Sequence, residues 1–369
     1  MKVFLAGASL LPSYGGPAFS VSRLAHALAD AGIEVGLWAA DQSAATTTLL
    51  SAESPVRRLT GSERIALDSF GQADVIHDNG IWLPHNHRLA QLARRRGIPR
   101  VVSTRGMLEP WAMNHKRWRK ALAWRLYQRR DLVGAQRLHA TAEEEAANVR
   151  RLGLGPPVAV VPNGVDLPEL SEVVTDAGAC PDQPRTALFL GRIYPVKGLL
   201  MLVEAWAQLR PPGWILRIAG PDEAGHRGEV QAAVTSSGLS DVVSFVGPVA
   251  GEEKRTLLLS ADVLVLPSYS ESFGMAVAEA LAHGTPVLTT TAVPWPTLAQ
   301  RGCGWRVEPN VAGVAQGLRL VMSSSSQTLG EMGARGRAFM AAEFGWDGVA
   351  RQFVKIYETI SDKGAVHAT

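Results

Sequence analysis

The sequence contains little cysteine and no hydrophobic run long enough to cross a membrane. Its two cysteines, Cys180 and Cys303, lack the spacing of metal ligands and imply no disulfide framework, as expected in a reducing cytoplasm. No window approaches the roughly 18–20 apolar residues of a transmembrane helix. The apolar start Met1–Leu11 runs directly into Gly15-Gly16 and an amphipathic helix. We therefore interpret it as a first β-strand and not as a signal peptide.

Several catalytic signatures are also missing. The chain has no G-x-S-x-G, P-loop or H-E-x-x-H pattern, which argues against hydrolase, NTPase and zincin chemistry. The G-x-G-x-x-G fingerprint does not follow the first strand, which disfavours a dehydrogenase. There is no Asp-x-Asp and no His/Cys/Asp cluster with metal-ligand spacing. Negative charge on a ligand would therefore have to be met by basic side chains and helix dipoles, without Mg²⁺ or Mn²⁺.

Length and composition indicate a soluble protein of two domains. A chain of 369 residues is too long for one ordinary core, and 46% hydrophobic with 19% charged residues is typical of a globular protein. Residues 1–165 hold 21 Lys and Arg against 13 Asp and Glu, a net of +8, and residues 166–369 hold 16 against 21, a net of −5. The basic first half suggests an anionic partner or a membrane surface. A solvated basic face without a partner is an equal alternative.

Apolar strands alternate with helices in both halves, which predicts two parallel, doubly wound sheets. We place the first domain at 1–165, a linker at 166–184 and the second domain at 185–345. Ligands of such domains bind at the carboxyl ends of the strands, in a cleft between the two facing sheets. The predicted strands are Val3–Ala6, Glu34–Ala39, Asp74–His77, Arg100–Ser103, Gln136–Ala140, Val158–Val161, Thr186–Leu190, Trp214–Ala219, Val242–Phe245, Val263–Pro267 and Val287–Thr290.

The most informative motif is a pair of glutamates, Glu271 and Glu279, between two apolar runs. The order strand, loop, helix, strand puts Glu271 in the loop and Glu279 about one and a half turns into the helix. The backbone N–H groups of Phe273–Met275 lie at the helix N-terminus, where negatively charged oxygen is stabilised. A ligand with hydroxyls at two ends and phosphate between them, such as a nucleotide sugar, suits this arrangement.

Two further loops carry groups that suit phosphate. Arg192 offers a bidentate fork and Lys197 a point charge in the loop after the strand Thr186–Leu190, and together they could stabilise a departing diphosphate. Gly15 and Gly16 let the backbone approach a ligand closely ahead of a helix that opens at or after Pro17. The alternatives are two solvated basic residues and a plain tight turn.

Taken together, these motifs resemble retaining glycosyltransferase family 4, also called glycosyl transferases group 1. The resemblance spans the whole chain and rests on Gly15-Gly16, Gly191-Arg192 with Lys197-Gly198, Pro162–Asp166 and the Glu271/Glu279 pair. It implies a GT-B fold, in which two Rossmann-like domains face each other across a cleft. It also implies a C-terminal helix, within 346–369, that packs back on the first domain.

The resemblance further implies a role for each motif residue. Glu279 would bind the ribose of the donor, while Glu271, Ser272 and the backbone of Phe273, Gly274 and Met275 would hold the donor sugar. Arg192 and Lys197, assisted by Gly15 and Gly16, would hold the pyrophosphate. Members of the family transfer with retention and without a metal, and a front-face route is often proposed for them. We assign Glu271, Arg192 and Lys197 as the catalytic residues, and we name no residue as a covalent nucleophile.

The acceptor side is less well marked. Trp82–His87 and Ser103–Trp111 look like a branch of the family that assembles bacterial polysaccharides. Where many relatives carry a histidine before glycine, this chain has Arg105, which could contact phosphate or an acidic acceptor. We place His77, Arg105 and Asn163 on the acceptor or sugar side. For His77, a role in merely capping its strand is the alternative.

A basic and aromatic stretch runs from Lys116 to Arg130. As a helix it could touch anionic lipid or a lipid-diphosphate acceptor. Alternatively, Trp118, Leu122 and Leu126 form a core-facing stripe and the arginines are simply solvated. Nucleic-acid binding is not expected, because no known module is present.

The sequence therefore predicts an enzyme, a metal-independent hexosyltransferase without cofactor. It would move sugar from a UDP- or GDP-sugar to a glycan or lipid-linked acceptor in surface polysaccharide synthesis. We expect it in the cytoplasm, with peripheral contact on the inner face of the membrane. The alternatives are a nucleotide-sugar epimerase of similar fold and a non-catalytic nucleotide-sugar sensor.

Overall fold

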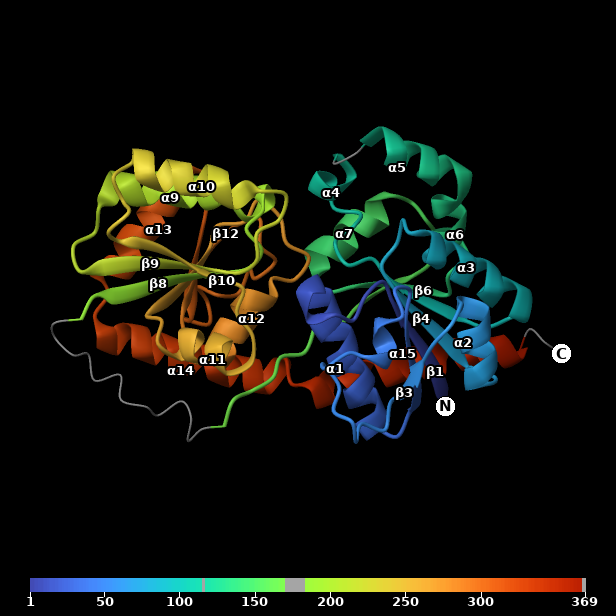
Figure 1. Cartoon of the computed structure of the whole chain (residues 1–369). Coiled ribbons are helices and arrows are strands. Elements are labelled where there is room, and N and C mark those ends of the chain that lie inside the picture. Colours follow the sequence, from blue (N-terminus) through green and yellow to red (C-terminus); the bar gives the residue numbers. More distant parts are fainter. Residues whose placement is uncertain (115–116, 170–182, 367–369) are drawn as a thin grey trace. The chain divides into compact units, whose positions relative to one another are not determined.

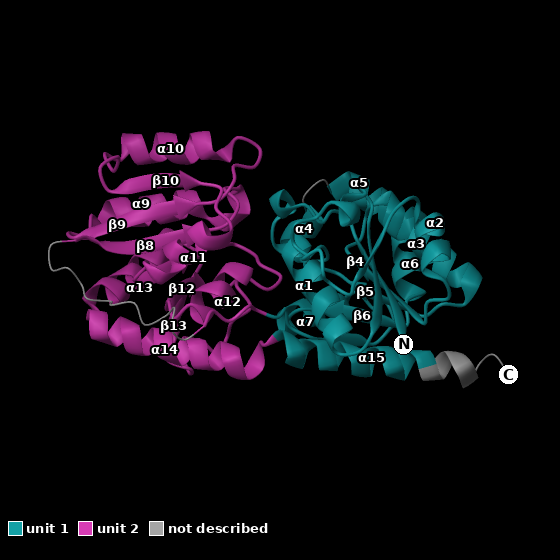
Figure 2. Ribbon diagram, turned by 60° about the horizontal axis from the view of Figure 1, so that its bottom comes forward, with its two compact units in different colours: residues 1–164, 346–369 teal, residues 165–345 magenta. Residues whose placement is uncertain are grey.

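The chain folds into two compact units. One comprises Met1–Gly164 with the segment from Trp346 onward, and the other comprises Val165–Gly345 (Figure 2). The computed structural model describes residues 1–114, 117–169 and 183–366, with side chains as far as 361. Lys116, Cys180, residues 170–182 of the predicted linker and residues 367–369 lie outside the described residues. No helix within the described ranges combines the length and apolar composition needed to cross a bilayer.

Unit 1 is built on a seven-stranded parallel sheet with the order β3-β2-β1-β4-β5-β6-β7 (Figure 1). The strand order reverses between β1 and β4, the place where doubly wound sheets bind ligands. The strands are β1 (Lys2–Gly7), β2 (Glu34–Ala39), β3 (Arg57–Leu59), β4 (Val75–Asn79), β5 (Arg100–Ser103), β6 (Arg137–Ala140) and β7 (Val158–Val160). The helices are α1 (Gly16–Asp30), α2 (Glu63–Phe70), α3 (Pro84–Arg96), α4 (Pro110–Asn114), α5 (Arg117–Ala123), α6 (Arg129–Val133), α7 (Glu143–Arg151) and α15 (Trp346–Val366).

The last helix, α15, completes the core of unit 1. Its buried residues recur at helical spacing, so one face is apolar. That face packs with α1 and the middle of the sheet, and Figure 1 shows the two helices side by side. The Trp346 ring lies over Gly164, where an added Cβ would come within 2.3 Å of it. The buried residues of α15 are Val349, Ala350, Phe353, Tyr357 and Ile360.

Unit 2 has a six-stranded parallel sheet with the order β10-β9-β8-β11-β12-β13. Here the order reverses between β8 and β11, so the loops after these strands meet. The strands are β8 (Arg185–Leu190), β9 (Trp214–Ala219), β10 (Val243–Gly247), β11 (Val263–Leu266), β12 (Val287–Thr290) and β13 (Gly304–Val307). The helices are α9 (Leu199–Leu209), α10 (His226–Ser236), α11 (Gly251–Leu259), α12 (Met275–Ala282), α13 (Val311–Ser323) and α14 (Ser326–Glu343).

Two strands were not predicted from the sequence. Both β3 and β13 lie at the edges of their sheets and are only three and four residues long. An edge strand needs no continuous apolar run, because one side of it faces solvent. The short segments Arg57–Leu59 and Gly304–Val307, each interrupted by arginine, therefore give no strand signal.

The basic stretch is helical from Arg117 to Val133, with one wider π turn at Trp124–Gln128 between α5 and α6. The alternative that Trp118, Leu122 and Leu126 face the core is wrong, because these side chains are 69%, 54% and 69% exposed. The buried side chains of this helix are Gln128, Asp131 and Leu132.

Candidate functional site

The loops after β8 and β11 carry the charged groups that the sequence analysis singled out in unit 2. Lys197 Nζ donates to Glu271 Oε1 over 2.5 Å, and Ser268 Oγ donates to the same oxygen over 2.8 Å. The Lys197 and Glu271 side chains are only 15% and 11% exposed. An ion pair this sheltered is held in a defined geometry, and removing either partner would leave a poorly solvated charge.

The position of Lys197 is fixed by Gly198. The backbone of Gly198 is left-handed, with φ 71°, and an added Cβ would lie 2.1 Å from the Pro267 carbonyl oxygen. The carbonyl of Val196, two residues before Gly198, accepts a hydrogen bond from Tyr269 N over 2.8 Å. Only glycine permits this close approach, which brings the Lys197 loop onto the end of β11.

Helix α12 begins at Met275, four residues after Glu271. Gly274 caps it with φ 82°, and the N–H groups of Phe273, Gly274 and Met275 donate to no acceptor among the described residues. The Phe273 ring is buried and packs on Trp295 with centroids 5.1 Å apart, while Trp295 Nε1 donates to the Phe273 carbonyl over 2.6 Å. Phe273 therefore offers a ligand only its backbone. The helix N-terminus favours an anion at this point.

Glu279 lies further along α12 and pairs with a residue that the sequence analysis missed. Lys254 Nζ, on α11, donates to Glu279 Oε1 over 2.9 Å, and the two side chains are 23% and 21% exposed. The sequence contains no local signal for this contact, because Lys254 comes from a different helix and reaches Glu279 only after the sheet has formed. Trp295 was missed for the same reason.

Arg192 does not join the Lys197–Glu271 pair. Its guanidinium contacts the Glu223 carboxylate, and both side chains are about half-exposed. An exposed pair of this kind contributes little stability. Arg192 is therefore available to a ligand at a small cost.

Gly15 and Gly16 belong to unit 1. Gly15 has φ 80° and caps α1, which begins at Gly16 and so opens slightly earlier than predicted. The Gly15 carbonyl accepts from Ala18 N over 3.0 Å, as the first bond of the helix. The two glycines thus follow β1 at the point where the strand order of unit 1 reverses.

Arg105 and Asn163, two of the predicted acceptor-side residues, lie together. Arg105 Nη1 donates to Asn163 Oδ1 over 2.7 Å and to Ser20 Oγ over 3.2 Å, and Arg105 Nη2 donates to Asn79 Oδ1 over 2.5 Å. Burial lowers the pKa of Arg105 to about 10, partly opposed by the Glu145 carboxylate, so the guanidinium remains charged at neutral pH. Its φ of 51° is unusual for a residue with a side chain.

The prediction for His77 needs correction. His77 lies inside β4 instead of closing it, and it is fully buried. Its Nδ1 lies 2.6 Å from Tyr357 Oη on α15, and its Nε2 lies 2.7 Å from Ser103 Oγ. Both ring nitrogens are therefore occupied by protein groups, so His77 does not contact an acceptor directly.

The hydrogen bonds around His77 form a chain with one direction. His139 Nε2 lies 2.8 Å from the Val161 carbonyl, which can only accept, so in the neutral ring His139 Nδ1 must accept from Ser103 Oγ, 2.6 Å away. Ser103 then accepts from His77 Nε2, and His77 Nδ1 accepts from the Tyr357 hydroxyl. This chain joins α15 to β4, β5 and β6.

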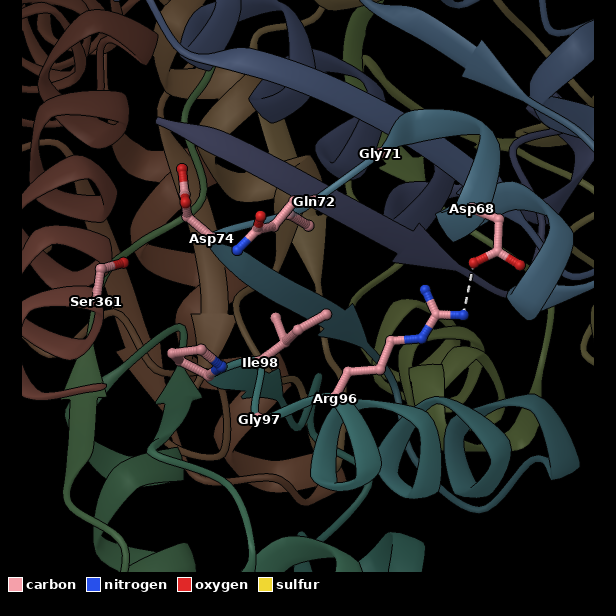
Figure 3. A pocket seen from close by; sticks show the side chains of 10 residues that line it. Asp68, Gly71, Gln72, Asp74, Arg96, Gly97, Ile98 and Ser361 are labelled. Atoms are coloured by element: carbon pink, nitrogen blue, oxygen red, sulfur yellow. Dashed lines mark hydrogen bonds and ion pairs between the residues drawn. The ribbon is translucent and has the colours of Figure 1, made fainter. Parts of the chain in front are cut away.

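A hollow of about 540 Å³ in unit 1 lies elsewhere (Figure 3). It is lined by residues ahead of β4 and β5, at the amino ends of the strands, and the ion pair of Asp68 with Arg96 (2.6 Å) borders it. Ligands of parallel sheets bind at the opposite edge. None of the predicted site residues lines this hollow.

Models of two protein domain families match the chain. The family "Glycosyl transferases group 1" matches residues 175–339, and the "Glycosyl transferase 4-like domain" matches residues 15–164. The matched ranges correspond closely to the two units.

Curated relatives agree with these matches. The chain is 34% identical to D-inositol 3-phosphate glycosyltransferase of Streptomyces bingchenggensis, over 64% of this chain and 55% of that protein. It is 32% identical to the protein of the same name from Streptomyces scabiei, over 78% of this chain and 68% of that protein. The aligned region thus spans little more than half the length of the first relative.

Solved structures share the fold. The chain is similar to sucrose-phosphate synthase from Thermosynechococcus elongatus, with a TM-score of 0.81, 21% identity, and 97% and 98% of the two chains covered. It is also similar to Anabaena HepE solved in complex with UDP and glucose, with a TM-score of 0.74, 20% identity, and 97% and 100% covered. The two parallel α/β units have the GT-B fold that the sequence predicted. The chain belongs to the glycosyl transferases group 1 family.

Proposed function

We propose that the protein is a retaining glycosyltransferase that moves a hexose from a UDP- or GDP-sugar to a hydroxyl of a glycan or lipid-linked acceptor. The observation that carries the proposal is the Lys197–Glu271 pair at the strand reversal of unit 2, directly ahead of α12. A cation, a carboxylate and a helix N-terminus converge there within one short loop system. These are the groups that a sugar diphosphate requires.

Each group has a part in the proposed reaction. Lys197, Arg192 and the N–H groups at the start of α12 neutralise the diphosphate, while Glu271 accepts hydrogen bonds from the sugar hydroxyls and Glu279 from the ribose. In transfer, the bond from the anomeric carbon to the diphosphate oxygen breaks, and the acceptor oxygen bonds to that carbon on the same face. The acceptor proton passes to the departing diphosphate. The developing negative charge is then met by side chains already in place.

The proposal includes independence from metal ions. Because basic side chains and the helix dipole are assigned the charge of the diphosphate, EDTA should leave turnover unchanged. A loss of activity in EDTA that Mg²⁺ or Mn²⁺ restores would contradict this part of the proposal.

The proposed acceptor chemistry and location rest on the sequence and the relatives. Surface polysaccharide synthesis and a cytoplasmic site of action, at the inner face of the membrane, agree with the basic first unit. The relatives named D-inositol 3-phosphate glycosyltransferase make D-inositol 3-phosphate the first acceptor to try. Arg105, held by Asn79 and Asn163, is the proposed contact for an acceptor phosphate.

The test is release of nucleoside diphosphate from UDP-, GDP- and ADP-sugars, with and without acceptor. We expect one donor to be consumed by the wild type and much more slowly by Glu271→Gln or Lys197→Ala. The exposed Glu331→Gln on α14 is the matched control and should behave as wild type. Conversion of the donor to an isomer without acceptor would instead indicate an epimerase. Binding without any turnover would indicate a sensor.

A further inference from the structure

An apolar stripe is exposed along the helical segment 117–133 of unit 1. Its members are Trp118, Leu122 and Leu126, which are 69%, 54% and 69% exposed. They recur every four residues, so they lie on one side of the helix, one turn apart. Three large apolar side chains held in water at one place are unfavourable unless something covers them.

The opposite face of the segment already anchors it to unit 1. Trp124 packs on Trp82 with ring centroids 6.0 Å apart, and Gln128 Oε1 accepts from Trp82 N over 2.8 Å. Tyr127 donates its hydroxyl to the Trp82 carbonyl over 3.0 Å. The stripe is therefore not needed to hold the helix in place.

Positive charge surrounds the stripe. Five exposed arginines lie in the segment, and the described residues provide none of them with a carboxylate at ion-pair distance. The single acidic residue of the segment, Asp131, is buried and bound by His87 Nδ1 over 2.6 Å. Like charges one turn apart repel each other, and an anionic surface would relieve that repulsion. The five arginines are Arg117, Arg119, Arg125, Arg129 and Arg130.

We propose that segment 117–133 is a docking surface for an anionic lipid bilayer. Trp118, Leu122 and Leu126 enter the boundary between headgroups and acyl chains, and the arginines bind lipid phosphates. Tryptophan and arginine suit this depth, because each combines an apolar body with a polar end. This is the arrangement of a helix lying in the plane of the interface.

Two other partners fit less well. A second copy of the chain would bring two sets of unpaired arginines together, which costs electrostatic energy. A nucleic acid would neutralise the arginines but leave the apolar stripe in water. Only a surface that is both anionic and apolar satisfies both groups at once.

The experiment is co-sedimentation of the full chain with vesicles, without donor or acceptor, so its outcome is independent of the proposed transfer. We expect binding to vesicles of equal parts phosphatidylcholine and phosphatidylglycerol, weak binding to phosphatidylcholine alone, and weaker binding as salt shortens the Debye length. The triple variant Trp118→Ser, Leu122→Ser, Leu126→Ser should lose binding. Arg125→Gln with Arg129→Gln should weaken it about tenfold or more.

The matched control is Arg319→Gln with Leu320→Ser, an exposed arginine and leucine on α13 of unit 2, which should bind as wild type. All variants change exposed side chains, and their unfolding temperatures should match the wild type. Equal binding to neutral and anionic vesicles, or no binding to either, would overturn the proposal. A dimer that the triple variant dissociates, or binding to RNA in place of vesicles, would overturn it in favour of those partners.

Discussion

Glu271 is paired before any ligand arrives. Lys197 and Ser268 both donate hydrogen bonds to the same carboxylate oxygen, Oε1. In the proposed function the other oxygen, Oε2, accepts from a sugar hydroxyl, and the two existing hydrogen bonds fix the orientation of the carboxylate in advance. Such pre-organisation reduces the cost of ordering the site when the donor binds.

Glu279 and Lys254 should act as one unit in binding the donor. Glu279→Ala should raise the KM of the donor about tenfold through loss of hydrogen bonds to a charged acceptor. Lys254→Ala should raise it in the same direction but less, because the carboxylate remains while its orientation is lost. Lys254→Arg should restore most of the affinity. Steady-state kinetics with the donor identified in the turnover assay provides the measurement.

The donor itself offers a control for this prediction. A donor with a 2′-deoxyribose lacks one of the proposed hydroxyls, so it should be much less sensitive to Glu279→Ala and Lys254→Ala. Equal losses with ribose and deoxyribose donors would show that these residues act elsewhere. Lys355→Ala, an exposed lysine on α15, should change neither KM.

Arg192 should affect turnover more than binding. Arg192 is paired only with the exposed Glu223, so its guanidinium can turn to a diphosphate at a small cost. Arg192→Ala should therefore lower kcat by on the order of tenfold to a hundredfold, with a smaller change in KM, because its charge is needed most as the diphosphate departs. Equal changes in kcat and KM would contradict selectivity for the transition state.

For single residues, the sequence identified candidates that lie within a local motif. It did not identify residues that reach a candidate from another element of the fold. Glu271 and Lys197 each carry a local pattern, a loop between a strand and a helix. Lys254 and Trp295 have no such pattern, and their contacts with Glu279 and Phe273 arise from tertiary packing. His77 was misassigned because a histidine in a strand gives no sign of which side chains enclose it.

Among the elements, the loop between β8 and α9 depends on one glycine. Gly198→Ala should destabilise unit 2 by roughly 2–4 kcal/mol, since the new Cβ would overlap the Pro267 carbonyl and force the loop away from β11. Gly213 is a matched control, because its φ is also 71° but nothing lies within 4 Å of an added Cβ. Gly213→Ala should cost only about 1–2 kcal/mol, from the left-handed backbone alone. Urea unfolding measures both.

The same substitution has a functional consequence. If the loop moves, Lys197 no longer reaches Glu271, so Gly198→Ala should also lose turnover, whereas Gly213→Ala should retain it. Equal stabilities and activities for the two variants would show that the close approach to Pro267 does not position the loop.

Predictions for the elements succeeded where burial imposes a pattern. The central strands of both sheets are buried on two faces and read as apolar runs, so their positions were predicted to within a residue or two. The edge strands β3 and β13 were not predicted, because they are short and contain arginine residues that reach solvent. The helix 117–133 was predicted, but not which face turns outward, because aromatic and basic residues occur on both faces.

For the whole molecule, acid should destabilise unit 1 through its buried histidines. Burial lowers the pKa of His77 well below its ordinary range and the pKa of His139 to about 3. Above the unfolded pKa of about 6.5 each histidine is neutral in both states, and its burial costs no proton. As the pH falls from about 6.5 toward the folded pKa, the histidine is protonated only in the unfolded state, so the folded state loses stability. Within that interval the unfolded chain binds more protons, so stability should fall by about 1.4 kcal/mol per pH unit for each histidine.

Thermal unfolding between pH 7 and pH 5 tests this expectation. Burial raises the pKa of Glu109 to about 7 and that of Asp78 to about 6, which opposes the histidine effect in this range. The measurement is therefore the difference in slope between the wild type and His139→Gln, and equal slopes would show that the His139 ring does not remain neutral in the folded state.

The hydrogen bond from the Tyr357 hydroxyl to His77 also affects the order in which the two units can fold during synthesis. Unit 1 supplies the first 164 residues, yet its core includes side chains of α15 up to Ile360. A ribosome adding roughly 5–20 residues per second would need roughly 10–40 seconds to travel from the end of the first segment to that helix. During this interval His77 on β4 lacks its hydrogen bond to Tyr357, because α15 has not yet been synthesised. Unit 2, whose segment is continuous, can therefore complete its core first, so the unit that is synthesised first is the last to be finished.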